Sequence, residues 1–288
     1  SGMLSVVLAK PLIRSRGASV LRQRVTTAIV LALIAVWVVL KLPAIGFGTA
    51  LLAIVLLGAW EWAHLVGMNR TRSRLWYGAL ILTLILAFWP LVGSTMLIGS
   101  LLILVFASWC YVPIWLQRYA RQPDHLDRLM TLGSIGIIIL VGPWVALMGL
   151  RDKLGPGYVL FLLLLIWVAD IGAYFAGRRW GRRKLAPAIS PGKTWEGVWG
   201  AGAAALISAL IGAAALGMGS SWLWFVAICM ITVGFSIVGD LFESMIKRQR
   251  GVKDSGVLLP GHGGVLDRID SLTAAAPVFL LGLYGMQR

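Results

Sequence analysis

The chain has 288 residues, of which 59% are apolar and 13% are charged. A soluble domain carries roughly 45–50% apolar and about 25% charged residues, and a soluble fold could not hide this much apolar surface. The composition therefore excludes an ordinary soluble enzyme, a disordered chain and a disulfide-rich secreted scaffold. It indicates a polytopic membrane protein, whose backbone polar groups are satisfied within helices.

The N-terminal segment, residues 1–24, is basic and is interpreted as lying on the membrane surface. Ser1 and Gly2 precede the first methionine, and we interpret them as foreign to the natural chain. The net charge of the whole chain is +15. This excess would favour a nucleic-acid partner in a soluble protein, but Lys and Arg collect on the cytoplasmic side of membrane proteins. We therefore expect a lipid bilayer, and no nucleic acid, as the partner.

Nine apolar runs follow, each long enough or nearly long enough to cross a hydrocarbon core of about 30 Å. They span residues 25–42, 44–60, 76–92, 95–116, 131–150, 157–177, 197–217, 222–241 and 271–287. With the N-terminus inside, the inside segments carry 22 basic residues and the outside segments carry 4. This asymmetry predicts an all-α polytopic fold of about nine transmembrane helices with a cytoplasmic N-terminus. We divide the chain into N-terminal helices, 25–150, and a C-terminal catalytic region, 151–288.

Asp170 and Asp240 fall inside apolar runs or at their ends. A carboxylate at membrane depth costs roughly 2.5–3.5 kcal/mol on insertion scales, so each of these residues is a candidate functional residue. A structural ion pair or a polar contact between helices is the alternative for both.

A basic cluster at 178–193 separates these two acids, and it mostly reflects the cytoplasmic side of the membrane. Residues 192–194 resemble the end of a P-loop, but that motif needs a glycine where Pro187 stands, so a P-loop is rejected. Lys193 remains a candidate for phosphate binding, because it lies close to Glu196 at the start of a new span.

Asp240, Glu243 and Lys247 share one face if the segment around them is helical. Two carboxylates and an ammonium group at the end of a helix suit a divalent cation beside a phosphate. A Glu243–Lys247 pair that only satisfies itself explains the spacing equally well.

Charged residues and glycines are then concentrated within residues 253–270. They include Lys253, Asp254, Gly256, Gly261, His262, Gly263, Gly264, Asp267, Arg268 and Asp270. Glycines let the backbone approach a ligand and offer N–H groups to phosphate oxygens. The structural alternative is that Asp267 and Asp270 only stabilise the N-terminus of the last helix.

Residues 244–270 carry a long pattern, Ser-x2-Lys-Arg-x4-Lys-Asp-x-Gly-x2-Leu-Pro-Gly-His-Gly-Gly-x2-Asp-Arg-x-Asp. This pattern resembles, without departure, the signature of the phosphatidate cytidylyltransferases, or CDP-diacylglycerol synthases. Residues 190–197 and the nine-span layout are also similar to that family, and the size is similar to that of its bacterial form. The N-terminal half is similar only in hydropathy.

The resemblance implies that CTP and phosphatidate give CDP-diacylglycerol and pyrophosphate, for phospholipid biosynthesis. It further implies Mg²⁺, a K⁺ ion beside it, a homodimer, and a multi-pass protein of the bacterial inner membrane. The lipid phosphate is largely ionised near pH 7 and needs no general base, so the site must supply positioning and charge neutralisation. The charge count predicts that the site faces the cytoplasm.

The resemblance associates Asp240 and Asp267 with the metal centre and gives roles to their neighbours. The expected metal ligands are Asp240, Asp267, Asp270 and Glu243. The expected catalytic residues are Asp240, Lys247, Asp267, Arg268 and Asp270. The expected substrate-binding residues are Lys193, Glu196, Lys253, Asp254, His262, Gly263 and Gly264.

Two other functions would account for part of this pattern. An ion-coupled transporter would use Asp170 and Asp240 as intramembrane ion sites, but it leaves the glycine-rich loop and its flanking charges unexplained. Another lipid-phosphate transferase, such as a CDP-alcohol phosphatidyltransferase, would need a differently spaced set of aspartates, which the sequence lacks.

Overall fold

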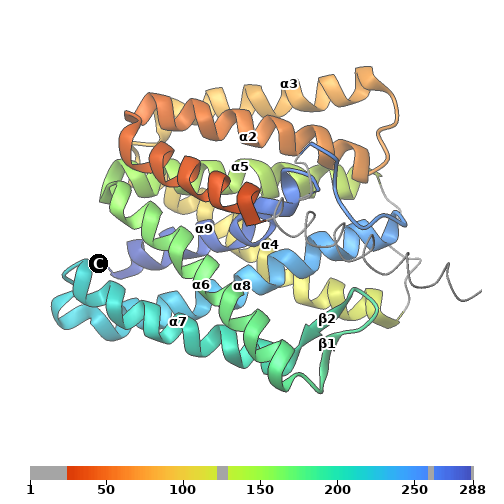
Figure 1. The fold of residues 1–288 in the computed structure, drawn as a ribbon. Helices are drawn as coiled ribbons and strands as arrows, with labels where there is room; N and C mark the ends of the chain where they lie inside the picture. Colours follow the sequence, from red (N-terminus) through yellow and green to blue (C-terminus); the bar gives the residue numbers. More distant parts are fainter. Residues whose placement is uncertain (1–24, 122–128, 259–262, 287–288) are drawn as a thin grey trace, which may run out of the picture.

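The computed structural model describes residues 25–121, 129–258 and 263–286. Within these ranges the chain forms nine α-helices and one two-stranded hairpin (Figure 1). They are a helix at Val25–Lys41, α2 (Ala44–Leu65), α3 (Thr71–Phe88), α4 (Thr95–Arg121), α5 (Leu129–Leu154), α6 (Pro156–Trp180), β1 (Lys184–Ala186), β2 (Ser190–Thr194), α7 (Trp195–Ala215), α8 (Trp222–Gln249) and α9 (Leu266–Met286). The interpretations of the basic segment 1–24 and of Gly261 and His262 fall outside the described residues.

Eight of these helices, α2 to α9, are long and apolar enough to cross a membrane, and the helix at Val25–Lys41 is apolar but shorter. Large apolar side chains lie on the outside of the bundle, among them Trp199 (74% exposed) and Ile211 (65% exposed). Such an apolar surface is unfavourable in water, whereas lipid tails can cover it without a comparable free-energy cost. The predicted all-α, multi-pass membrane fold is confirmed.

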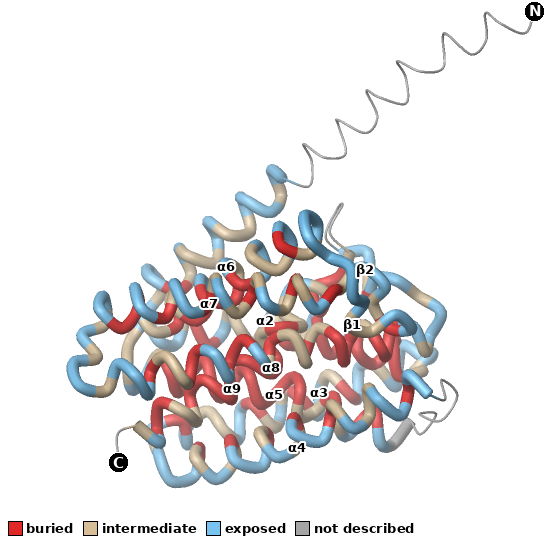
Figure 2. The backbone as a smooth tube through the Cα atoms, turned by 90° about the horizontal axis from the view of Figure 1, so that it is seen from below, coloured by how far each residue is buried: buried red, intermediate tan, exposed pale blue. Residues whose placement is uncertain are grey.

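The helices pack as a bundle whose centre is formed by α5 and α9 (Figure 1). Helices α2 and α3 pack together on one side of this centre, and α6, α7 and α8 pack on the other. The buried residues accordingly concentrate along α5, α8 and α9, while the outer faces of the flanking helices are exposed (Figure 2). One apolar cluster runs through the whole bundle, so both halves of the chain share a single core.

Two buried indole N–H groups are satisfied by hydrogen bonds between helices. The indole N–H of Trp62 donates to the carbonyl of Leu132 at 3.1 Å, and that of Trp144 donates to Gly48 at 3.1 Å. These bonds join α2 to α5 where no water is available. The structure therefore anchors α2, from the N-terminal half, directly to the central helix.

The hairpin was not predicted from the sequence. Its two strands are antiparallel, with Lys184 opposite Thr194 and Ala186 opposite Ser190. Thr194 ends the hairpin and begins α7, because its hydroxyl accepts the backbone N–H of Gly197 at 3.2 Å as an N-cap. This fixes the position of Lys193, the preceding residue of β2.

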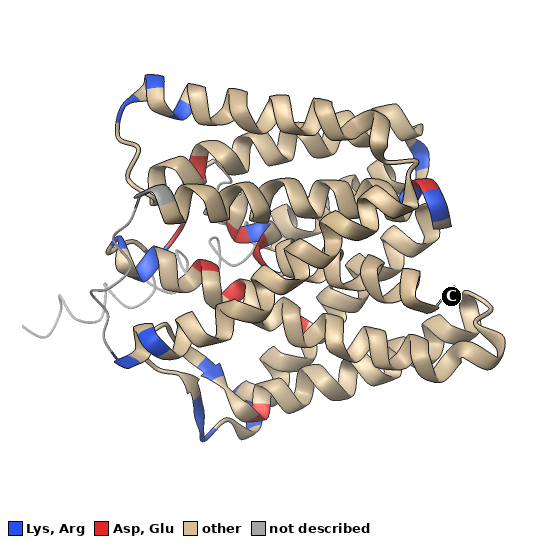
Figure 3. Cartoon of the chain, turned by 180° about the vertical axis from the view of Figure 1, so that it is seen from behind, with Lys and Arg blue, Asp and Glu red and all other residues tan. Residues whose placement is uncertain are grey.

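Lys and Arg gather at one end of the bundle, where the hairpin and the α2–α3 and α8–α9 connections lie (Figure 3). The opposite end carries only Lys41, Arg151, Asp152 and Lys153 among the charged residues that the structure describes. Most of the acidic residues drawn in Figure 3 lie in the same half of the bundle, which is where the sequence analysis predicted the functional residues.

Candidate active site

Two groups of charged side chains meet on α8, and they differ in how accessible they are. The first, which we call the open cluster, comprises Asp170 of α6, Lys193 of β2 and Asp240 of α8. Lys193 Nζ lies 2.5 Å from Asp240 Oδ2, and the two side chains are 27% and 29% exposed. Asp240 Oδ1 also accepts the hydroxyl of Ser244 at 3.3 Å. Asp170 is exposed, and the charges of Asp240 and Lys193 act on it.

The second group, the closed cluster, is buried between α8, α9 and α2. It comprises Glu61, Glu243, Lys247, Ser255 and Asp267. Lys247 Nζ lies 2.5 Å from Asp267 Oδ1 and 3.2 Å from Glu243 Oε1, and these three side chains are 5–9% exposed. The sequence left open whether Glu243 and Lys247 only satisfy one another; the pair forms, and Lys247 binds Asp267 as well.

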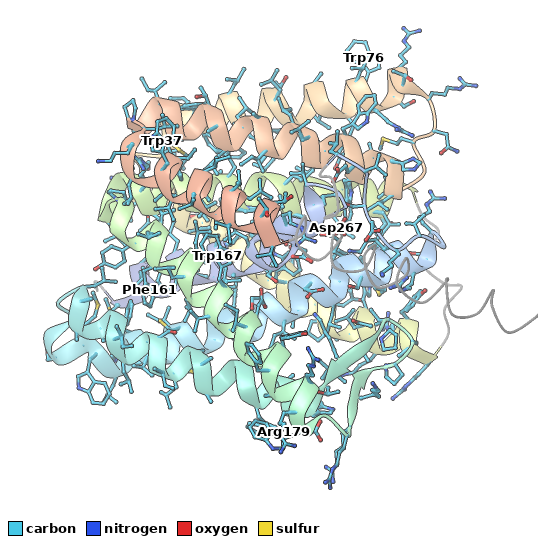
Figure 4. All side chains as sticks on the ribbon, viewed as in Figure 1. Trp37, Trp76, Phe161, Trp167, Arg179 and Asp267 are labelled. Atoms are coloured by element: carbon cyan, nitrogen blue, oxygen red, sulfur yellow. The ribbon has the colours of Figure 1, made fainter. Side chains whose placement is uncertain are left out.

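Asp267, which is labelled in Figure 4, accepts hydrogen bonds on both of its carboxylate oxygens. Oδ1 takes the ammonium of Lys247, while Oδ2 accepts the backbone N–H of Gly264 at 2.8 Å and that of Ser255 at 2.9 Å. The Ser255 hydroxyl lies 3.0 Å from the same Oδ2. Asp267 therefore organises the loop in front of α9, which is more than the N-terminal stabilisation of a single helix.

Asp270 joins the two clusters electrostatically, since the charges of Asp240, Lys193 and Lys247 all act on it. Its Oδ1 accepts the backbone N–H of Ser271 at 2.7 Å. A Cβ at Gly239 would lie only 2.7 Å from the carbonyl oxygen of Asp270. Glycine at 239 thus lets α8 approach α9 closely, next to Asp240.

The remaining candidates surround these clusters. Lys253, Asp254 and Arg268 are exposed, and they lie in the loop after α8 and in the first turn of α9. Gly263 has a φ of 80°, a conformation that glycine adopts without strain, and a Cβ there would lie 2.6 Å from Asp267 Oδ2. Lys253, Asp254 and Arg268 are therefore accessible to a ligand at the end of the bundle where Lys and Arg gather.

Glu196, an expected substrate-binding residue, accepts backbone hydrogen bonds at the base of the hairpin. Its carboxylate takes the N–H of Arg182 at 3.0 Å and that of Arg183 at 3.2 Å. Arg248 of α8 also donates to the carbonyl of Ile189 in the hairpin, at 3.2 Å. These contacts dock the hairpin on α8 and set the position of Lys193.

The sequence analysis missed Glu61, although it is one of the most buried acids of the bundle at 3% exposed. It lies on α2 and accepts hydrogen bonds from the segment around Ser255 and Val265. Its only sequence signal is a carboxylate within a long apolar helix, at the end of the run predicted at 44–60.

The donor chemistry fits a hard divalent cation best at the open cluster. Carboxylate oxygens are what Mg²⁺ prefers, and Asp240 is half-exposed, with the Lys193 ammonium resting on its Oδ2. The oxygens of Asp267 are taken by protein donors instead. Within the described ranges, no three acidic, His or Cys side chains converge as a ready-made ligand set.

Comparison with known proteins shows which family the chain belongs to. The profile of the cytidylyltransferase family matches residues 22–284. The chain belongs to the cytidylyltransferase family. The phosphatidate cytidylyltransferase of Pseudomonas aeruginosa is 42% identical over 277 residues, which are 90% of this chain and 95% of that protein. The phosphatidate cytidylyltransferase of Haemophilus influenzae is 38% identical, over 90% of this chain and 97% of that protein.

A third relative matches a smaller part of the chain. The phosphatidate cytidylyltransferase of Bacillus subtilis is 38% identical over 168 residues, which are 55% of this chain and 62% of that protein. The family match therefore extends well beyond residues 244–270, and it includes the N-terminal helices that the sequence analysis related to the family only by hydropathy.

Proposed function

We propose that this chain transfers the cytidylyl group of CTP to phosphatidate, giving CDP-diacylglycerol and pyrophosphate. The observation that carries the proposal is the near full-length match to proteins named phosphatidate cytidylyltransferase. The half-exposed ion pair between Lys193 and Asp240, which lies inside the matched region, supports it. The transporter alternative is not favoured, because ion transport alone does not need the glycine-rich segment that surrounds Asp267.

The reaction joins a phosphatidate oxygen to the α-phosphorus of CTP and breaks the bond from that phosphorus to the oxygen that bridges the α- and β-phosphates. Pyrophosphate leaves with the electron pair. The ionised lipid phosphate is itself the nucleophile, so the residues have to align the two anions and neutralise their charge. The exposed cations Lys253 and Arg268, and the half-exposed Lys193, suit this role.

Magnesium is part of the proposal, with a K⁺ ion beside it. Asp240 and Asp270 would hold the Mg²⁺, with Asp267 and Glu243 behind them. When bound, Mg²⁺ supplies charge neutralisation on the triphosphate. Lys193 would leave Asp240 Oδ2 for the CTP phosphates, which is feasible because both side chains are half-exposed. Lys247 is held by two carboxylates, so its role is to orient Asp267.

The proposal also covers location and organisation. The site would face the cytoplasm of a bacterial inner membrane, as the concentration of Lys and Arg at its end of the bundle supports. Residues 151–288 would supply the reacting groups, and residues 25–150 the helices that support them. Light scattering of the detergent-solubilised protein would test the expected homodimer.

The test is product formation from radiolabelled CTP and phosphatidate by the purified protein. We expect label in a lipid with the mobility of CDP-diacylglycerol, and none after EDTA is added. Asp152→Asn is the matched control, since Asp152 is exposed at the opposite end of the bundle and lies 4.0 Å from Lys153. Lipid labelling that persists in EDTA would contradict the metal requirement, and no labelled lipid would contradict the function.

A further inference from the structure

Glu61 is a carboxylate buried in a membrane-spanning helix and without a cationic partner among the described residues. It is 3% exposed, and none of the ion pairs in the described ranges includes it. A buried charge is costly unless hydrogen bonds satisfy it. Its partners therefore indicate why this position carries an acid.

The three hydrogen bonds that Glu61 accepts from described residues come from Ser255 and from the start of α9. Oε1 accepts the N–H of Val265 at 3.0 Å, and Oε2 accepts the N–H of Leu266 at 2.9 Å. The first N–H groups of a helix have no partner within the helix and form the positive end of its dipole. Glu61 therefore fixes the residue at which α9 begins, one position before Asp267.

Ser255 extends this connection to Asp267. Its hydroxyl oxygen lies 2.9 Å from Glu61 Oε2 and 3.0 Å from Asp267 Oδ2. Its backbone N–H donates to Asp267 Oδ2 at 2.9 Å. Ser255 is itself buried, at 3% exposed. The side chains of Glu61 and Asp267 thus hold one serine between them, and Lys247 closes the far side of Asp267.

Two glycines give an independent indication of the same contact. A Cβ at Gly256 would overlap Glu61 Oε1, and a Cβ at Gly264 would overlap Ser255 Oγ and lie 2.5 Å from Glu61 Oε2. Neither glycine has a positive φ. The backbone conformation therefore does not require glycine at these two positions. The Glu61 carboxylate occupies the space that a side chain would need at position 256, and with the Ser255 hydroxyl it occupies that space at position 264.

We propose that Glu61 is a positioning residue for the transferase site: it holds Ser255 and the first turn of α9 so that Asp267 stays in the geometry that the reaction needs. Glu61 acts through Ser255 and Asp267, and a residue of the N-terminal half thereby becomes part of the active site. The proposal rests on the proposed function, because Asp267 is a site residue only if that function holds.

The first test compares Glu61→Gln with Trp144→Phe. Gln keeps the size but places an amide N–H₂ against backbone N–H donors. Trp144→Phe removes a buried hydrogen bond between α5 and α2 away from the loop, so it is the control for simple loss of stability. We expect Glu61→Gln to lower kcat at least tenfold and to raise the half-saturating Mg²⁺ concentration, with little change in KM for phosphatidate. Trp144→Phe should lower only the melting temperature.

A second measurement on the same variants does not depend on catalysis: it is the change in melting temperature when ligands bind. Mg²⁺ with CTP should raise the melting temperature of the wild type and of Trp144→Phe, because a ligand of the folded state stabilises it. Glu61→Gln should lose most of that shift. If Glu61→Gln matches Trp144→Phe in kcat, Mg²⁺ requirement and shift, Glu61 is only structural and the proposal is wrong.

The second test does not depend on the function. Gly256→Ala should lower the melting temperature in the wild-type background, where Cβ meets Glu61. In a Glu61→Ala background the carboxylate no longer fills that space, so Gly256→Ala should lower the melting temperature only slightly. If the decrease in melting temperature of the double variant equals the sum of the decreases of Gly256→Ala and Glu61→Ala, the proposed contact is wrong. Turnover that is absent even in the wild type would refute the proposed function instead, while this melting cycle would still decide whether Glu61 holds the loop.

Discussion

The open and closed clusters each contain a lysine–aspartate ion pair, but the two pairs differ in burial and in their other partners. Lys193 and Asp240 are 27% and 29% exposed, whereas Lys247 and Asp267 are 9% and 6% exposed. Asp240 has one ammonium and one hydroxyl partner, and Asp267 has donors on both oxygens from three residues. A half-exposed pair can exchange its partner for a metal ion or a phosphate, whereas breaking a buried pair strands a charge. The open cluster is therefore suited to binding the metal ion and the substrate. The closed cluster is suited to holding the surrounding helices and loop in place.

Lys247→Met should have the largest effect on the protein. It leaves Glu243 and Asp267 without their shared cation in a buried site, which costs about 3–5 kcal/mol. We expect poor extraction, a strongly lowered melting temperature in detergent and no turnover. Lys184→Met is the control, because Lys184 is exposed on β1. A wild-type melting temperature for Lys247→Met would show that the closed cluster does not stabilise the fold around the site.

Asp267→Asn should come next. The amide keeps the shape of the side chain but loses the ion pair to Lys247 and turns an N–H₂ group toward backbone donors. We expect turnover to fall by more than about a hundredfold, which is 2.7 kcal/mol of barrier, together with a lowered melting temperature. Loss of activity at wild-type stability would instead place Asp267 with the open cluster.

Lys193→Gln should affect substrate binding more than folding. The ion pair to Asp240 is half-exposed, so its loss costs at most about 1 kcal/mol of stability. If Lys193 moves to the CTP phosphates, its removal should raise KM for CTP about tenfold, or 1.4 kcal/mol. Arg179→Gln is the control, since Arg179 is exposed at the end of α6 (Figure 4). An unchanged KM for CTP would remove Lys193 from the site.

Cysteine labelling has the smallest expected effect on the protein, and it tests whether the hairpin and the α8–α9 loop lie on the same side of the membrane. Cysteines at Arg182 and Lys253 should react with an impermeant reagent only from the cytoplasm, and a cysteine at Gly219 only from outside. The native Cys110 is exposed and must first be replaced with serine, whereas Cys229 is buried. Labelling of both sets from one side would contradict the predicted topology.

The bundle was predictable because hydropathy is a local signal. Every apolar run corresponds to a helix, yet the helices often extend beyond the runs. Helix α8 continues to Gln249, for example, whereas the run was predicted to end at 241. Hydropathy marks the lipid-embedded part, while the backbone hydrogen bonds of a helix continue into polar residues. The rarity of acids inside the runs likewise pointed to Asp240.

The support around the site was not predictable in the same way. Glu61 contacts Val265 and Leu266, about two hundred residues later in the chain, and no local pattern encodes a contact of that range. The hairpin at 184–194 is too short and too polar to show strand alternation. The roles of Gly256 and Gly264 also depend on the carboxylate that lies against them.

The most direct test of the account is Asp240→Asn, with turnover and melting temperature measured on one preparation. Asn preserves the size and the hydrogen bond to Ser244 but removes the charge. If Asp240 belongs to the reacting cluster, turnover should fall by more than about a hundredfold while the melting temperature stays close to that of wild type. If the variant keeps more than about a tenth of the activity, less than 1.4 kcal/mol of barrier, Asp240 is structural and the division between the two clusters is wrong.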